Sequence, residues 1–264
     1  MHAFVRTLSP HWLSRLIRLV RIAQQNNRFD RWRRANPSKK FRHYFAELER
    51  PGLLNGWKHP SLGGNLTEGE FGESGAEALE VLIEHGLTPN DACVDYGCGT
   101  LRIGIHLINY LEPHGYFGLD VDELFVNEGI NLLDEEMIID KAPRFGVISP
   151  ESVAKAAATK PKLLFSWKVL LHVHPDELVE YFTNIVTIIG ENGTALVCSK
   201  WGNGTETIQF GGQSWAHPIG KVSDGLADLG CSVEVLCKRA SPLPDLGIDG
   251  DQGILKIKRL AAPS

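Results

Sequence analysis

The sequence lacks the cysteine patterns that hold zinc sites and small disulfide-linked domains together. Its 264 residues contain five cysteines, an odd number, and no two of them form a C-x-x-C pair. Neither a zinc site nor a disulfide framework is indicated, so we expect no bound metal and a reducing compartment such as the cytoplasm.

Long apolar runs are also missing. No run approaches the roughly 18 to 20 apolar residues that a membrane-spanning helix needs, and the N-terminus has no uninterrupted apolar stretch followed by a small-residue cleavage site. We therefore expect a cytoplasmic protein that crosses no membrane. The overall charge of −5 is small, so composition alone does not indicate a nucleic-acid-binding protein.

The charge is unevenly distributed along the chain. Residues 1–50 contain 12 Lys and Arg against three Asp and Glu (net +9), whereas residues 51–264 contain 15 against 29 (net −14). Residues 12–23 place apolar side chains on one arc of a helix and three arginines on another. We predict a basic helical N-terminal extension over residues 1–50 and one α/β domain over residues 51–264.

Several partners fit this extension. A basic amphipathic helix can lie on an anionic membrane surface, so peripheral contact through residues 11–42 at the inner membrane face is one prediction. Packing on its own domain, or on a second copy of the chain in a homo-oligomer, is the alternative. Aromatic side chains between the basic residues also allow nucleic acid as a less favoured partner.

Beyond residue 75 the sequence alternates between short apolar runs and helical patterns. Residues 51–75 are rich in glycine and are predicted to form a loop region, with long helices later at 122–137 and 175–189. The predicted strands are 92–96, 116–119, 145–148, 162–165, 194–199, 231–238 and 252–259. Alternating strands and helices indicate a largely parallel, Rossmann-like sheet with helices on both faces.

A glycine turn follows the first predicted strand. Asp95 lies at the end of the apolar run, and Gly97 and Gly99 lead directly into a helix, so backbone N–H groups can approach a ligand closely. Asp120 ends the next strand roughly twenty residues later, where a carboxylate can accept hydrogen bonds from two ribose hydroxyls. This order of elements predicts a site for a nucleotide-like cofactor.

The last position of the glycine pattern distinguishes between cofactors. Dinucleotide-binding turns follow G-x-G-x-x-G/A, and here the final position is Arg102. A nicotinamide-dependent oxidoreductase is therefore the minority interpretation.

Residues 95–99 (DYGCG) and 118–120 (GLD) resemble the first two motifs of class I S-adenosylmethionine-dependent methyltransferases. Residues 164–173 and 191–194 are similar to that family's fourth-strand motif and to the turn before its fifth strand. The resemblance covers residues 70–260 and implies a Rossmann-like seven-stranded methyltransferase sheet with S-adenosyl-L-methionine as the cofactor. Thr100 and Leu101 depart from the family pattern, in which many members have a third glycine.

The resemblance also assigns roles to individual residues. The residues it places at the cofactor are Asp95, Gly97, Cys98, Gly99, Asp120, Val121, Phe165, Ser166 and Trp167, with Gly75 and Glu77 as weaker candidates. Methyl transfer from a sulfonium needs positioned reactants and, for a hydroxyl acceptor, a base. His172 and His174 follow the fourth predicted strand and are the candidate catalytic residues. Further candidates for the acceptor site are His59, His217, Trp201 and Trp215.

Several acceptor classes are disfavoured. Enzymes that methylate amino groups of nucleic-acid bases carry a D/N-P-P-Y type sequence after the fourth strand, whereas this chain has FSWK at residues 165–168. No cysteine occupies the nucleophile position of cytosine carbon-5 enzymes, and no carboxylates lie near Lys168 as catechol-type enzymes need. The leading prediction is O-methylation of a small-molecule, glycan or lipid-linked acceptor. An RNA or protein methyltransferase and a non-catalytic S-adenosylmethionine-binding module stay open.

Overall fold

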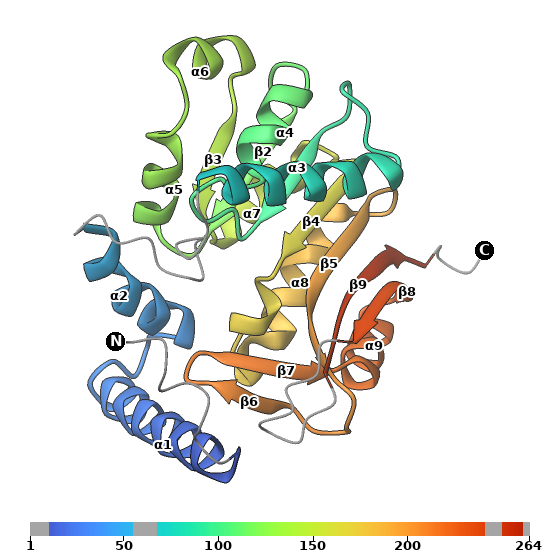
Figure 1. Cartoon of the computed structure of the whole chain (residues 1–264). Helices are drawn as coiled ribbons and strands as arrows, with labels where there is room; N and C mark the ends of the chain where they lie inside the picture. Colours follow the sequence, from blue (N-terminus) through green and yellow to red (C-terminus); the bar gives the residue numbers. More distant parts are fainter. Residues whose placement is uncertain (1–10, 55–67, 241–249, 261–264) are drawn as a thin grey trace.

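The computed structural model describes residues 11–54, 68–240 and 250–260. Two N-terminal helices, α1 (His11–Ala35) and α2 (Phe41–Leu54), precede one sheet flanked by helices (Figure 1). Within the described residues, none of the helices is long and apolar enough to span a bilayer.

In the part of the chain that the structure describes, the sheet contains nine strands. They are β1 (Cys93–Tyr96), β2 (Tyr116–Asp120), β3 (Arg144–Val147), β4 (Leu163–Trp167), β5 (Thr194–Gly202), β6 (Ile208–Gly211), β7 (Ser214–Pro218), β8 (Cys231–Ala240) and β9 (Gly250–Arg259). The first five are parallel in the order β3-β2-β1-β4-β5. Antiparallel β9 continues the sheet beyond β5, and β8 pairs with β9. Together these seven strands confirm the predicted methyltransferase sheet.

The strand order places a crevice at β1. The chain winds from β1 to β2 and β3 on one side, and β4 and β5 lie on the other. In open α/β sheets, ligands bind outside the carboxyl ends of the strands at this reversal. The glycine turn after Tyr96 therefore lies at the expected position for a ligand site.

Helices cover both faces of the sheet, as predicted. The helices are α3 (Glu68–Glu84), α4 (Gly104–Tyr110), α5 (Glu123–Ile130), α6 (Glu135–Lys141), α7 (Pro150–Ala158), α8 (Leu178–Ile189) and α9 (Ile219–Asp228), with 3-10 turns η2 (Leu170–His172) and η3 (Pro175–Glu177). Val94 and Tyr96 belong to the core that includes α7, α8 and α9, whereas Cys93 packs with α3 and α4. This alternation is the two-residue period of a strand that is buried on both faces.

Local sequence signals explain several helix ends. Ser149 and Ser152 form a reciprocal capping box at the start of α7, and Pro150 occupies its first turn. The carboxylate of Asp122 caps α5 by accepting the Leu124 N–H. Helix α8 ends at Gly190, whose φ of +57° suits glycine.

The structure corrects two predicted segments. Helix α2 continues through Pro51, and α3 begins at Glu68, so parts of the predicted loop at 51–75 are helical. Burial of Phe41, Tyr44 and Phe45 on one face stabilises α2 despite its proline. The predicted helix at 122–137 is two helices, α5 and α6, because the turn between them directs Leu133 into the core.

The hairpin of β6 and β7 is an addition that the sequence analysis did not predict, since the segment is rich in glycine. Strand β7 pairs with β5 at Trp201 and Gly202, beyond the last residue of β5 that pairs with β4. The hairpin thus extends the sheet past the carboxyl end of β4. Helix α1 lies beside β6 (Figure 1), and the side-chain amides of Asn26 and Gln209 bond to each other at 2.9 and 3.0 Å.

Candidate functional site

The glycine turn and Asp120 form one hydrogen-bonded unit. The N–H groups of Gly97 and Cys98 donate to the Leu119 carbonyl at 2.7 and 3.0 Å. The Gly99 and Val121 N–H groups each donate to a different carboxylate oxygen of Asp120 at 2.7 Å. Gly97 has a φ of +91°, and a Cβ there would lie 2.2 Å from the Val169 side chain. Only glycine fits this close approach.

Asp120 is a buried carboxylate that lines a cavity. Burial raises its pKa to about 6, although the Gly99 and Val121 N–H groups oppose the rise. Each carboxylate oxygen can accept more than one hydrogen bond. The Asp120 carboxylate can therefore accept hydrogen bonds from hydroxyl groups of a ligand while the backbone N–H groups keep it in place.

Asp95 occupies the other side of the glycine turn. Burial raises its pKa to about 8, opposed by the Tyr116 hydroxyl, which donates to it at 2.9 Å. Arg102 lies near enough to lower the pKa of Asp95 and donates to the Ser74 hydroxyl at 2.9 Å. Asp95 and Arg102 line a small cavity with Gly97 and Trp167. An acid and a guanidinium in one cavity suit a zwitterionic group.

A larger cavity begins at the same turn and shares Gly97, Gly99 and Trp167 with the small one. Apolar and aromatic side chains form much of its wall, among them Phe45, Val121, Phe125, Ile148, Val173 and Tyr181. Asp120 lies in this cavity, and so do Lys168 and His172. The two cavities therefore lie side by side at the carboxyl ends of β1, β2 and β4.

The structure brings most of the predicted cofactor residues together. The ones that line the cavities are Asp95, Gly97, Cys98, Gly99, Asp120, Val121 and Trp167. Phe165 and Ser166 are fully buried instead. The Ser166 hydroxyl donates to the Tyr96 carbonyl and accepts from the Tyr181 hydroxyl, so it links β4, β1 and α8. Gly75 packs against the Arg102 carbonyl, and Glu77 is exposed.

Among the histidines, His172 lies on the larger cavity. Its Nδ1 is 2.8 Å from the Gln213 carbonyl, which only accepts, so Nδ1 carries the proton and the neutral ring has its basic lone pair on Nε2. The Nδ1 of His174 accepts the Asp176 N–H and caps η3, and its ring packs on Phe41. His174 does not line either cavity.

The remaining candidates that the structure describes line neither of the two cavities. Burial lowers the pKa of His217 to about 4, and its ring bridges the Thr207 hydroxyl and the Val173 carbonyl. Trp201 is buried and donates to the Gly253 carbonyl. Trp215 packs edge-on against Phe41, so it supports α2 rather than the cavity wall. His59 lies outside the described residues.

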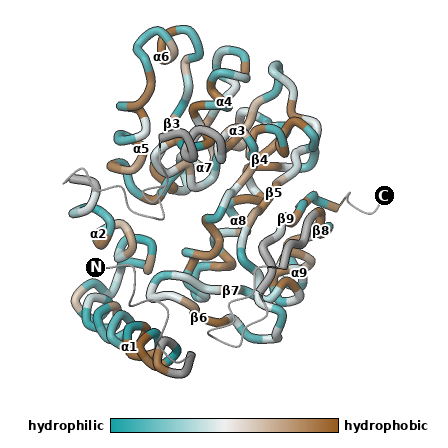
Figure 2. Tube along the Cα trace, viewed as in Figure 1, coloured by the Kyte–Doolittle hydropathy of each residue, from teal (hydrophilic) through white to brown (hydrophobic). Residues whose placement is uncertain are grey.

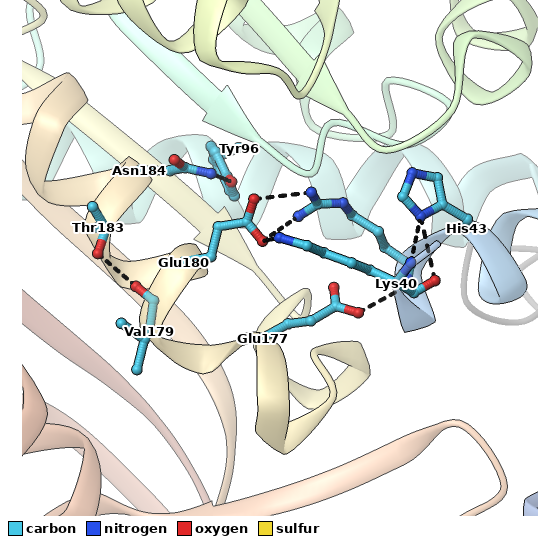
Figure 3. A network of polar contacts seen from close by, with 9 residues as sticks. Lys40, His43, Tyr96, Glu177, Val179, Glu180, Thr183 and Asn184 are labelled. Carbon is cyan, nitrogen blue, oxygen red and sulfur yellow. Dashed lines mark hydrogen bonds and ion pairs between the residues drawn. The ribbon is translucent and has the colours of Figure 1, made fainter. Parts of the chain in front are cut away.

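Helix α2 supplies two residues of the wall, Arg42 and Phe45, that sequence reasoning missed. The Arg42 guanidinium forms a bidentate pair with Glu180 at 2.8 and 2.9 Å, and Lys40 reaches the same carboxylate at 2.7 Å (Figure 3). Buried Glu177 accepts the Arg42 N–H at the start of α2, which explains why a carboxylate is tolerated there. At the other end of α2, Arg50 pairs with Asp122 at 2.8 Å. Helix α2 is thus fastened to both sides of the cavity.

Lys168 is a third wall residue that sequence reasoning missed. It follows β4, has a φ of +60° and lines the larger cavity. A non-glycine residue in the left-handed region is uncommon and carries strain that often marks a functional site. Its position inside the fourth-strand motif was a usable signal, whereas no local pattern indicated that α2 would reach the site.

Comparison with known proteins gives the class of the fold. No protein-family model matches the sequence, and no curated protein matches it. Magnesium protoporphyrin IX methyltransferase from Synechocystis PCC 6803 with bound SAH has a TM-score of 0.50 and 16% identity, covering 92% of this chain and 98% of its own.

Two further solved methyltransferase structures are similar to this chain. The Burkholderia thailandensis 1,6-didemethyltoxoflavin-N1-methyltransferase has a TM-score of 0.53 and 13% identity, covering 83% of this chain and 91% of its own. A geranyl diphosphate methyltransferase in complex with SAM has a TM-score of 0.53 and 13% identity, covering 70% and 85%. These likenesses confirm that the chain has the class I methyltransferase fold.

Proposed function

We propose that this protein is an S-adenosylmethionine-dependent methyltransferase that acts on a hydroxyl group of a small-molecule, glycan or lipid-linked acceptor. The observation that carries the proposal is the pair of cavities that meet at Gly97 and Gly99. One contains Asp120, and the other contains Asp95 and Arg102. A molecule with a ribose at one end and a zwitterionic tail at the other would place the ribose at Asp120 and the tail at Asp95 and Arg102.

The residues of the site would divide the donor between them. Asp120 would accept the ribose hydroxyls, and Val121, Phe125 and Ile148 would contact the adenine ring. Asp95 would face the ammonium of the methionine tail, and Arg102 its carboxylate. When bound, the donor supplies a methyl group on an activated sulfonium.

His172 is the base in this proposal. The Gln213 carbonyl holds its Nδ1–H and thereby fixes the ring with Nε2 as the proton acceptor. Nε2 would take the proton of the acceptor hydroxyl while the hydroxyl oxygen bonds to the methyl carbon and the bond from that carbon to the donor sulfur breaks, which leaves the donor as the neutral thioether. Phe45, Val173 and Tyr181 supply apolar surface that would orient the acceptor and exclude water.

Calorimetric titration with S-adenosylmethionine, S-adenosylhomocysteine and NAD tests the proposal. The wild type is compared with Asp120→Ala, and Asp134→Ala serves as the control because Asp134 is an exposed acid at the start of α6. We expect the first two ligands to bind, Asp120→Ala to weaken both by about tenfold to 100-fold, and the control to bind as the wild type does.

Other results of these experiments would contradict the proposal and indicate a different function. Binding of NAD alone would indicate an oxidoreductase, and absence of binding would refute a methyltransferase. If the donor binds, methyl transfer from labelled donor to extracted glycans and lipids tests the acceptor class. Transfer only to RNA or protein would refute the hydroxyl acceptor, and the absence of transfer to any of these would favour a non-catalytic binding module.

A further inference from the structure

Helix α1 contacts the rest of the molecule through one face. Asn26 bonds to Gln209 of the hairpin, and Phe29 packs on Phe41 and Tyr44 of α2. Arg33 forms an ion pair with Asp176 at 3.7 Å. These contacts fix the rotation of α1 about its axis, so a defined opposite face points away from the domain.

The opposite face begins with a group of large apolar side chains. Leu16, Ile17, Leu19 and Val20 are 50%, 44%, 50% and 47% exposed. We name these four residues the apolar patch. Figure 2 shows that hydrophobic residues gather in the N-terminal half of α1 and hydrophilic residues in its C-terminal half. Isolated exposed apolar residues are ordinary, but a contiguous group indicates a binding surface.

Arginines extend and border the apolar patch. Arg31 follows Val20 by about three helical turns and Arg34 follows Leu16 by about five, so both continue the line of the patch along the helix. Arg15 and Arg21 lie beside it. All four arginines are exposed, and within residues 11–54, 68–240 and 250–260 none of them forms an ion pair.

We propose that this face of α1 binds anionic lipid surfaces. The apolar patch would insert among the lipid chains near the headgroups, and the four arginines would contact the phosphates. A second copy of the chain is disfavoured, because a two-fold contact through this face would set the arginines against one another. Helix α1 packs on α2 through Phe29, and α2 lines the cavity, so binding of α1 to lipid would hold the domain that carries the proposed acceptor site at the lipid surface.

Vesicle co-sedimentation tests the inference with the full chain. The probes are vesicles of phosphatidylcholine alone and vesicles with about 30% phosphatidylglycerol, each at low and high salt. We expect binding to the anionic vesicles that falls with salt, and little binding to phosphatidylcholine. The double variants Leu16→Ser/Val20→Ser and Arg31→Gln/Arg34→Gln should each weaken binding by about tenfold or more.

Matched control variants test whether the effect on vesicle binding is specific to this face of α1. Ile139→Ser removes a 76% exposed apolar side chain on α6, and Lys221→Gln removes an exposed cation on α9. Both should bind vesicles as the wild type does. The inference is overturned if the wild type does not bind anionic vesicles, if the variants bind as tightly as the controls, or if they instead dissociate a dimer in lipid-free sedimentation. Titration of the same samples with S-adenosylmethionine tests donor binding independently of lipid binding. Failure of the lipid inference can therefore be distinguished from failure of the proposed function.

Discussion

The two sides of the site are built in different ways. The polar groups of the proposed donor side come from one continuous segment, residues 95–121, in which a strand, a glycine turn and a second strand bring Asp95 and Asp120 together. The proposed acceptor side combines α2, the turn after β4 and the hairpin that holds His172, and more than a hundred residues of sequence separate α2 from the other two elements. Backbone geometry specifies the first side, whereas packing between distant elements specifies the second. A change on one side should therefore leave the other side working.

The largest effect should follow from Gly97→Leu on the donor side. Its new Cβ would lie 2.2 Å from Val169, and its φ of +91° disfavours any other residue. Donor affinity should fall by about 100-fold or more, measured by calorimetry. Gly86→Leu is the matched control, because Gly86 has a φ of +95° but nothing within 4 Å of the added Cβ. Equal donor affinities in the two variants would contradict the close approach.

On the acceptor side, His172→Ala should leave donor affinity within about threefold of the wild type. Turnover should fall by about 100-fold, because a positioned base contributes at least that much. His174→Ala is the comparison, since His174 does not line the cavity. If turnover fell equally in the two variants, or in neither, another group would be the base.

A smaller effect should distinguish the two cations on Glu180. Arg42 lines the cavity and Lys40 does not, although both pair with the same carboxylate. Arg42→Ala should raise the acceptor KM several-fold, whereas Lys40→Ala should leave it nearly unchanged. Each pair is partly exposed, so either change should cost no more than about 1 kcal/mol of stability. Equal KM values would show that Arg42 only fastens α2.

A separate effect should appear in the stability of the unliganded protein. Burial raises the pKa of Asp95 to about 8, above its ordinary value, so the folded state binds this proton more tightly than the unfolded state does. Its contribution to stability is therefore complete at acidic pH and is lost as pH rises through about 8. Asp95→Asn keeps an acceptor for the Tyr116 hydroxyl and should flatten the decline of Tm between about pH 5 and pH 8. An unchanged decline would mean that Asp95 is already ionised.

Local signals in the sequence were sufficient to predict the strands and helices of the sheet and the glycine turn. Each of the seven predicted strands overlaps one strand of the sheet, because each buried strand is a short apolar run and each helix between them has an amphipathic pattern. The turn at Gly97 and Gly99 was equally readable, because a positive φ and a close approach leave little choice of residue. The β6–β7 hairpin was missed, since its glycines resemble those of an irregular loop.

The sequence by itself determined the glycine turn and the two acids of the proposed donor side, because these groups lie within one βαβ unit and are specified by backbone geometry. Only the tertiary structure decided which histidine faces the cavity, because His172 and His174 are two residues apart and point into different surroundings. It also decided that Arg42 and Phe45 belong to the wall, since their positions depend on ion pairs and aromatic packing with α8, α5 and the hairpin. Contacts between residues so far apart leave no periodic or local pattern, which is why the acceptor side had to be seen in three dimensions.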